Sequence, residues 1–187
     1  NALEPQEENY SWPKISKAYL EVLDGLGIES FNLLGWSKGG HEAEHVLANG
    51  NGRVQSLIIT GTPPLPMDLS ALSRAFKAPL TEAGSADQFT EDQARSFAQV
   101  AGINVDFAVK TAMRTDGKAR SLMMKSAIAG NRVDEVETLK SATVPVLVLG
   151  GQDDPLINYE YVSGLGFPQS VQIKLIPGDH GIPFNAA

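Results

Sequence analysis

Gly-Trp-Ser-Lys-Gly at residues 35–39 is the most informative part of this chain. It follows Ser-Phe-Asn-Leu-Leu at residues 30–34, which is typical of a strand, and it opens a segment of helical character. Gly-x-Ser-x-Gly between a strand and a helix predicts a nucleophile elbow, a strained turn that holds a serine hydroxyl clear of its neighbours. We expect a side chain at either flanking glycine to crowd this turn. Ser37 is therefore our candidate nucleophile.

A serine becomes a nucleophile only when a base accepts its proton and a third group orients that base. Residues 143–149 predict a buried strand that breaks at Gly-Gly-Gln-Asp-Asp-Pro, residues 150–155. Residues 171–176 alternate like a strand and lead into Pro-Gly-Asp-His-Gly, residues 177–181. The resulting order of serine, acid and histidine, each following a strand, differs from the orders in chymotrypsin and subtilisin. His180 is the candidate base.

From the elbow to the histidine loop, most of its length, the chain resembles the α/β-hydrolases. The acid of that family lies three residues beyond a glycine, in a Gly-x-x-Asp-Pro setting, which implies Asp154 here with Asp153 as the alternative. The resemblance implies an α/β-hydrolase fold with a mostly parallel sheet and a helical cap inserted between strands. It also implies a Ser37–His180–Asp154 triad and places the backbone N–H of Lys38, the residue after the nucleophile, in the oxyanion hole.

Three further runs narrow the resemblance. They are Gly-Trp-Ser with Gly-Gly-His at 35–41, Ile-Thr-Gly-Thr-Pro-Pro at 59–64, and Arg-Thr-Asp-Gly-Lys-Ala-Arg at 114–120. Together they are similar to the branch that contains the α/β-hydrolase-fold N-acyl-homoserine lactonases. This similarity implies a carboxylic ester or a lactone as the small-molecule substrate.

Composition excludes several classes of partner. The chain has 187 residues, of which 42% are hydrophobic, so it can bury one substantial core. Its net charge of −7 and the lack of a basic patch argue against nucleic acid. No apolar run approaches the ~18 residues of a membrane span. With no cysteine, disulfides and thiolate metal sites are excluded. We expect a cytoplasmic enzyme without a cofactor.

The pattern along the chain predicts three regions. Residues 1–62 would form hydrolase core with the elbow, 63–140 the helical cap, and 141–187 core with the acid and histidine loops. Helices are expected at 12–26 and 38–48, and a strand at 54–60. The apolar residues of the cap either line an acyl pocket or form the core of the cap itself: Leu69, Leu72, Phe76, Phe89, Phe97, Val100, Phe107, Met113, Leu122 and Met123.

The resemblance also implies segments that this sequence does not show. A complete α/β-hydrolase has about four strands before the elbow, including a His-Gly-type loop that donates a second oxyanion N–H, and a helix after the histidine loop. We therefore expect the chain to be part of a longer or split protein whose first half of the sheet lies on another segment. On its own it should be weakly active or inactive.

Two residues of the elbow allow more than one interpretation. Lys38 stands where the family favours an uncharged side chain. Its ammonium could assist the oxyanion or bind a polar acyl substituent, but an i,i+4 ion pair with Glu42 is favoured. Trp36 either packs beside the elbow or contacts the substrate.

His-Glu-Ala-Glu-His at residues 41–45 matches His-Glu-x-x-His, which on a helix can bind zinc through two imidazoles. The extended motif would require glycine and histidine where Ala48 and Asn51 stand, and His180 is the one other histidine of the chain. We expect a chance match, with the two histidines flanking the buried face of the helix, and no metal site. A zinc metallohydrolase is an alternative function.

A non-catalytic ligand binder of the same fold is the other alternative. Such a protein keeps the triad but turns its ligand over slowly or not at all. Replacing Ser37 with alanine would then leave the ligand affinity unchanged.

Overall fold

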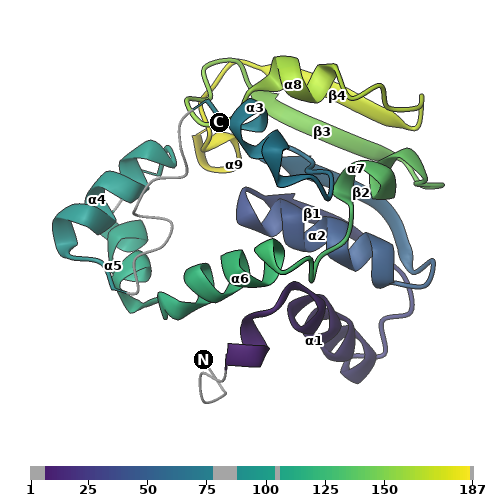
Figure 1. The fold of residues 1–187 in the computed structure, drawn as a ribbon, viewed down its shortest axis with the longest axis horizontal. Helices are drawn as coiled ribbons and strands as arrows, with labels where there is room; N and C mark the ends of the chain where they lie inside the picture. Colours follow the sequence, from purple (N-terminus) through teal and green to yellow (C-terminus); the bar gives the residue numbers. More distant parts are fainter. Residues whose placement is uncertain (1–6, 78–87, 104–105, 186–187) are drawn as a thin grey trace.

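The computed structural model describes residues 7–77, 88–103 and 106–185, which form one parallel sheet with helices packed against it (Figure 1). Strands adjacent in the sheet are consecutive in sequence, and all three pairings are parallel. Parallel neighbours need a crossover connection, which helices supply here. The strands are β1 (Phe31–Trp36), β2 (Val54–Thr60), β3 (Val146–Gly151) and β4 (Val171–Ile176). The predicted α/β class and parallel sheet are confirmed.

Two strands differ at their ends from the predicted ranges. The strand predicted at 143–149 begins and ends later, because the glycines at 150 and 151 stay in the sheet and pair with β4 instead of breaking it. The strand predicted at 30–34 likewise extends through Gly35 and Trp36, which pair with the end of β2. The other two strands occupy the predicted residues, 54–60 and 171–176.

Helix α2 (Lys38–Asn49) follows the elbow and packs on β1 and β2. Helices α1 (Trp12–Gly25) and α7 (Glu135–Lys140) pack in turn on α2. The main core forms where these helices and α8 (Tyr159–Ser163) meet the sheet, and its most buried members include Leu57, Ile59, Leu139, Val148 and Val162. The core therefore fixes the carboxyl edge of the sheet, where the candidate catalytic loops begin.

The described residues between β2 and β3 form helices joined by loops, in agreement with the helical pattern predicted for 63–140, and contain no strand; Phe76 forms an isolated bridge with Ile157, which follows β3. None of the described helices combines the length and apolar character needed to cross a membrane. Besides α7, this segment contains η2 (Leu69–Ala71), α3 (Leu72–Ala75), α4 (Glu91–Val100), α5 (Asp106–Arg114) and α6 (Lys118–Ile128). Two short elements lie near the ends, η1 (Glu7–Tyr10) and α9 (Ile182–Asn185).

Helices α4 and α5 lie to one side of the sheet and share a small core of their own (Figure 1). Small residues make most of it, with Ala94 and Ala98 packing against Phe89 and Val109. Because alanines occupy the contact face, larger apolar side chains point outward. Of the two interpretations of the apolar cap residues, a place in the core of the cap is wrong for four that are exposed, and a place in an acyl pocket stays a prediction for them: Phe97, Val100, Phe107 and Met113.

Candidate active site

Ser37 lies in the strained turn that the sequence predicts. It follows β1 and precedes the first residue of α2, with a positive φ of 53°, and non-glycine residues rarely adopt such a φ except where the surrounding structure holds them. Three contacts hold it here. The N–H of Ser37 donates to Thr60 O at 2.8 Å, and Ser37 O accepts from Gly40 N at 2.9 Å and from Thr62 Oγ1 at 2.7 Å. The end of β2 therefore holds the backbone of the elbow.

The crowding predicted for the two flanking glycines of the elbow is confirmed at Gly35 and wrong at Gly39. A Cβ on Gly35 would lie 2.4 Å from Gly39 O, so glycine is required there. A Cβ on Gly39 would meet no atom within 4 Å, and the expected crowding at that position is wrong, because Gly39 lies on an open side of the first turn of α2. The crowded position is instead Gly40, whose Cβ would lie 2.0 Å from Thr62 Oγ1.

His180 joins the other two candidate catalytic residues. Its Nε2 lies 3.0 Å from Ser37 Oγ, and its Nδ1 lies 3.0 Å from Asp154 Oδ2. The imidazole is almost completely buried, at 2% exposure. The loop that carries it runs from β4 back across the ends of β3 and β2. It passes so close to Gly151 that a Cβ there would lie 2.3 Å from Asp179 O. It also brings the imidazole so close to Gly61 that a Cβ there would lie 2.8 Å from His180 Cε1. Gly61 has a φ of +62°, and because it has no side chain it leaves room for the imidazole ring.

Asp154 is the acid that the fold brings to His180. Its Oδ1 accepts hydrogen bonds from the N–H groups of Leu156 at 2.8 Å and Ile157 at 3.2 Å, and its Oδ2 faces His180. Burial pushes the pKa of Asp154 upward. The hydrogen bond and charge of His180 and the two N–H donors outweigh burial, so the pKa is lowered overall. The alternative acid, Asp153, is exposed.

Three groups around the acid were not identified from the sequence. The hydroxyl of Tyr159 lies 3.4 Å from Asp154 Oδ2, and burial together with the charge of Asp154 raises the pKa of this phenol. Lys77 Nζ donates to the backbone oxygen of Asp154 at 2.7 Å. Gly61 lies under the imidazole and belongs to the run 59–64 that carried the family resemblance. A glycine between two threonines at this position was the one signal in the sequence for a place under the imidazole.

Trp36 packs against the histidine loop. Its Nε1 donates to His180 O at 2.7 Å, and its ring lies 5.6 Å from the imidazole and 5.0 Å from the ring of Phe184. This hydrogen bond joins the end of β1 to the loop after β4. A substrate contact by Trp36 stays a prediction.

Lys38 forms the ion pair that the sequence favours. Its Nζ contacts Glu42 Oε1, and Glu42 Oε2 accepts a hydrogen bond from the hydroxyl of Tyr19 at 2.8 Å. Burial and the charge of Glu42 raise the pKa of Tyr19 to about 12. The same ammonium lies 3.6 Å from Met123 Sδ, which brings α6 beside the elbow. Since the first N–H groups of a helix have no intrahelical acceptor, the N–H of Lys38 suits the predicted oxyanion role.

The two histidines of the His-Glu-x-x-His stretch do not converge on one point. His45 Nδ1 lies 2.8 Å from His41 O, and its Nε2 accepts from the N–H of Val133 at 3.1 Å. Both ring nitrogens are therefore used within the protein, and burial lowers the pKa of His45. The ring is buried and stacks on Trp12 at 4.9 Å. The expected flanking position is wrong for His45, because α1 covers it.

Comparisons with known proteins identify the family of the fold. The family model described as the α/β hydrolase fold matches residues 3–187. A search of curated proteins found no match. The solved structure of the N-acyl homoserine lactonase AidH with N-butanoyl homoserine is 28% identical, with a TM-score of 0.89 over 100% of this chain and 69% of that one. AidH with N-hexanoyl homoserine lactone is 26% identical, with a TM-score of 0.88 over 96% and 68%.

A more distant structure shares the fold alone. The meta-cleavage product hydrolase of Pseudomonas fluorescens is 15% identical, with a TM-score of 0.74 over 100% of this chain and 70% of that one. Since the family model covers nearly the whole sequence, the chain belongs to the α/β-hydrolase fold family, as a hydrolase that resembles its N-acyl homoserine lactonase branch.

Proposed function

We propose that the protein is a serine hydrolase that cleaves a carboxylic ester or a lactone through Ser37, His180 and Asp154. The observation that carries this proposal is the pair of 3.0 Å contacts that link Ser37 Oγ to His180 and His180 to Asp154. The first distance allows His180 to accept the proton of the Ser37 hydroxyl, and the second allows Asp154 to orient the imidazole.

In the proposed reaction, Ser37 Oγ attacks the carbonyl carbon while His180 Nε2 accepts the hydroxyl proton. Asp154 stabilises the imidazolium that forms, and its lowered pKa keeps it ionised for this task. His180 returns the proton to the departing alkoxide, which leaves an acyl group on Ser37. With a lactone the alcohol stays attached to the acyl group, so a single hydrolysis by water releases the ring-opened hydroxy acid.

The tetrahedral intermediate carries a negative charge that needs preorganised donors, each worth roughly 3–4 kcal/mol of barrier. We assign one of them to the backbone N–H of Lys38, at the first residue of α2. The charged side chain of Lys38 points to Glu42, so the proposed role belongs to the backbone alone.

For the substrate class, we propose N-acyl homoserine lactones as the first compounds to examine. The support is the likeness to AidH at 26–28% identity. The helical segment 63–140 is proposed to be the cap that selects the acyl chain. Helix α6 reaches the elbow through Met123, and flexible thioether side chains suit an apolar chain of variable length.

Labelling with a fluorophosphonate tests the proposal directly. We expect one adduct in the intact mass of the protein, lost in Ser37→Ala, followed by ring opening of a short-chain acyl homoserine lactone or cleavage of a short-chain ester. An unlabelled wild-type protein that includes the strands expected before the elbow would contradict an activated Ser37, whereas an unlabelled 187-residue chain would show only that those strands are needed. If Ser37→Ala and wild type then bound the lactone equally without turnover, the protein would be a ligand binder.

A further inference from the structure

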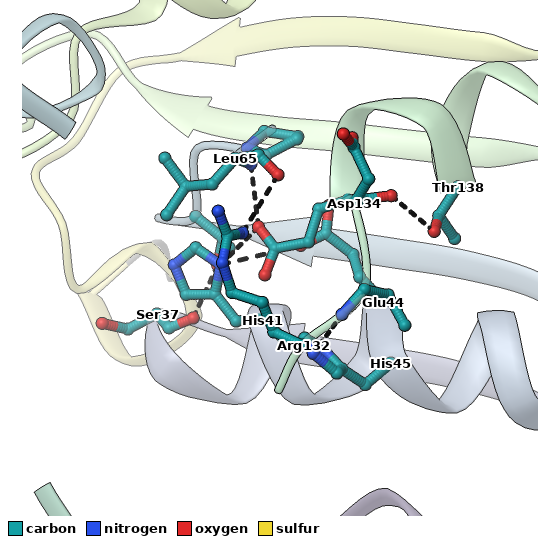
Figure 2. Close-up of polar contacts among 12 residues, drawn as sticks. Ser37, His41, Glu44, His45, Leu65, Arg132, Asp134 and Thr138 are labelled. Carbon is teal, nitrogen blue, oxygen red and sulfur yellow. Dashed lines mark hydrogen bonds and ion pairs between the residues drawn. The ribbon is translucent and has the colours of Figure 1, made fainter. Parts of the chain in front are cut away.

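A second group of ionisable side chains lies one helical turn from Ser37 and has no part in the proposed reaction. His41 and Glu44 belong to α2, and Glu135 is the first residue of α7. His41 Nδ1 lies 2.9 Å from Glu135 Oε2 and 3.7 Å from Glu44 Oε2. Figure 2 shows His41 and Glu44 on α2, with Ser37 just before the first residue of that helix.

Glu44 is the unusual member of the cluster. Its side chain is completely buried, and neither of its carboxyl oxygens has a hydrogen-bond partner among the described residues. Burial, and then the charge and the carboxyl group of Glu135, raise the pKa of Glu44 well above its usual value, so without a cation the two carboxyl groups would share a proton. A buried carboxylate without a donor is costly unless a positive charge compensates it. Among the described residues, His41 is the one potential cation in contact with the two carboxyl groups, so an ionised Glu44 would need a further positive charge beside it.

Arg132 lies beside the cluster, but none of its described hydrogen bonds or ion pairs goes to Glu44 or Glu135, and its Nε is buried without a described partner. Arg132 directs its two terminal nitrogens to the backbone oxygens of Leu65 and Pro66 (Figure 2). The N–H of Leu65 donates to Glu135 Oε2 at 2.8 Å, which orients that carboxylate toward His41. Such backbone contacts to a carboxylate are typical of the surroundings of metal ligands.

We propose that His41 Nδ1, Glu44 and Glu135 bind one divalent transition-metal ion, of the Zn²⁺ or Mn²⁺ type. The three donor atoms lie within 4.8 Å of one another. Bonds of about 2.0–2.2 Å in a tetrahedral site place neighbouring ligand atoms about 3.3–3.6 Å apart, and the separations of 2.9 and 3.7 Å from His41 Nδ1 bracket that range. The imidazole nitrogen suits Zn²⁺, and the two carboxylates suit both Zn²⁺ and Mn²⁺.

The proposed site differs from the zinc motif considered in the sequence and departs from the expectation of no metal. It keeps His41 but replaces His45, whose nitrogens are both used, with Glu44 from the same helix and Glu135 from 91 residues further along. His41 has a partly exposed side chain, 13%, which gives the ion a route in and leaves a position for water. The ion would fasten α7 to the helix that begins at Ser37. Its role is structural, and it does not depend on the proposed function.

The experiment titrates chelator-treated protein with ZnCl₂ or MnCl₂, with MgCl₂ for comparison. Bound metal is measured by elemental mass spectrometry and stability by thermal unfolding. Glu44→Gln keeps the shape of the side chain but removes its charge. Glu42→Gln makes the same change two residues away on the same helix, outside the cluster. Circular dichroism verifies that each variant is folded, and His41→Asn provides a second change within the site.

We expect about one bound ion per chain and a rise in melting temperature of about 5–11 °C when the free ion reaches 100 times its Kd. Glu44→Gln and His41→Asn should lose both effects, and Glu42→Gln should keep them. Two results would overturn the site. One is equal uptake by wild type and Glu44→Gln. The other is a wild-type protein that neither binds Zn²⁺ or Mn²⁺ nor is stabilised by them. If the Glu44→Gln variant were then at least as stable as the wild type, Glu44 would be assigned a proton shared with Glu135.

Discussion

The hydroxyl of Thr62 donates to Ser37 O at 2.7 Å and occupies the space that a Cβ on Gly40 would need. The same hydroxyl also lies within hydrogen-bond distance of Thr60 O, at 3.1 Å. Through this one side chain, the residues that follow β2 fix both the carbonyl of the candidate nucleophile and the first turn of α2. The geometry of the elbow thus depends on a contact from a separate segment as well as on its own glycines.

This contact predicts opposite effects for two adjacent glycines. Gly40→Ala would place a methyl group 2.0 Å from Thr62 Oγ1, and we expect a loss of unfolding free energy of about 1–3 kcal/mol from overpacking. Gly39→Ala meets no atom within 4 Å and should stabilise the helix by about 0.5–1 kcal/mol. Urea denaturation measures both. Equal losses in the two variants would show that the elbow tolerates no side chain at either position.

The two neighbouring aspartates should differ in their effect on turnover. Asp154→Asn removes the charge beside His180 Nδ1, and a loss in kcat of about 10³–10⁴-fold is expected by analogy with the serine protease triad. Asp153→Asn changes an exposed side chain and should leave kcat within about twofold. Steady-state hydrolysis of the best ester or lactone compares the two. A larger loss in Asp153→Asn would reassign the acid.

The lowered pKa of Asp154 predicts how acid destabilises the protein. Its folded-state pKa lies below the ordinary value of 3.8, so the carboxylate contributes stability that is fully present above that value. The contribution is lost as the pH falls through the lowered pKa. Denaturation of wild type and Asp154→Asn from about pH 7 to about pH 3 should show a stability gap that shrinks on acidification. A gap that widens would mean that burial, and not His180, dominates the titration.

The ion pair of Lys38 predicts a small effect on stability. Lys38→Met and Glu42→Gln break the same contact, whose lysine side chain is half exposed, and each should lower the unfolding free energy by about 0.3–0.5 kcal/mol. The double variant should lose no more than either single one. A fall in kcat confined to Lys38→Met would show instead that the ammonium assists the oxyanion.

The parts of the site that follow from local patterns could be predicted from the sequence. Ser37 and His180 each follow a strand that its own residues predict, so their meeting at one edge of the sheet was expected. The strand ends were harder to predict, because pairing with β4 keeps the glycines at 150 and 151 extended where the sequence predicts a break. The catalytic roles themselves stay predictions until labelling and kinetics test them.

Contacts between segments far apart in the chain could not be predicted from the sequence. The meeting of Glu44 and Glu135 depends on α7 packing against α2, and nothing in either segment indicates it. Whether Gly39 or Gly40 is crowded is decided by Thr62, more than twenty residues away. Phe107 is exposed because alanines of α4 occupy the contact between α4 and α5. In each case tertiary packing, and not local propensity, fixes the outcome.

The hydrogen bond from Trp36 to His180 O spans 144 positions of the chain and joins the first strand of the described sheet to the loop after the last one. Closing a loop of this length costs conformational entropy, and we expect the contact to form once pairing of the intervening strands has brought its two ends together. We therefore expect the candidate nucleophile and base to come together only after the sheet is complete. Partly folded molecules, including those newly released during synthesis, would carry a hydroxyl without an adjacent base and would be unable to attack esters in their surroundings.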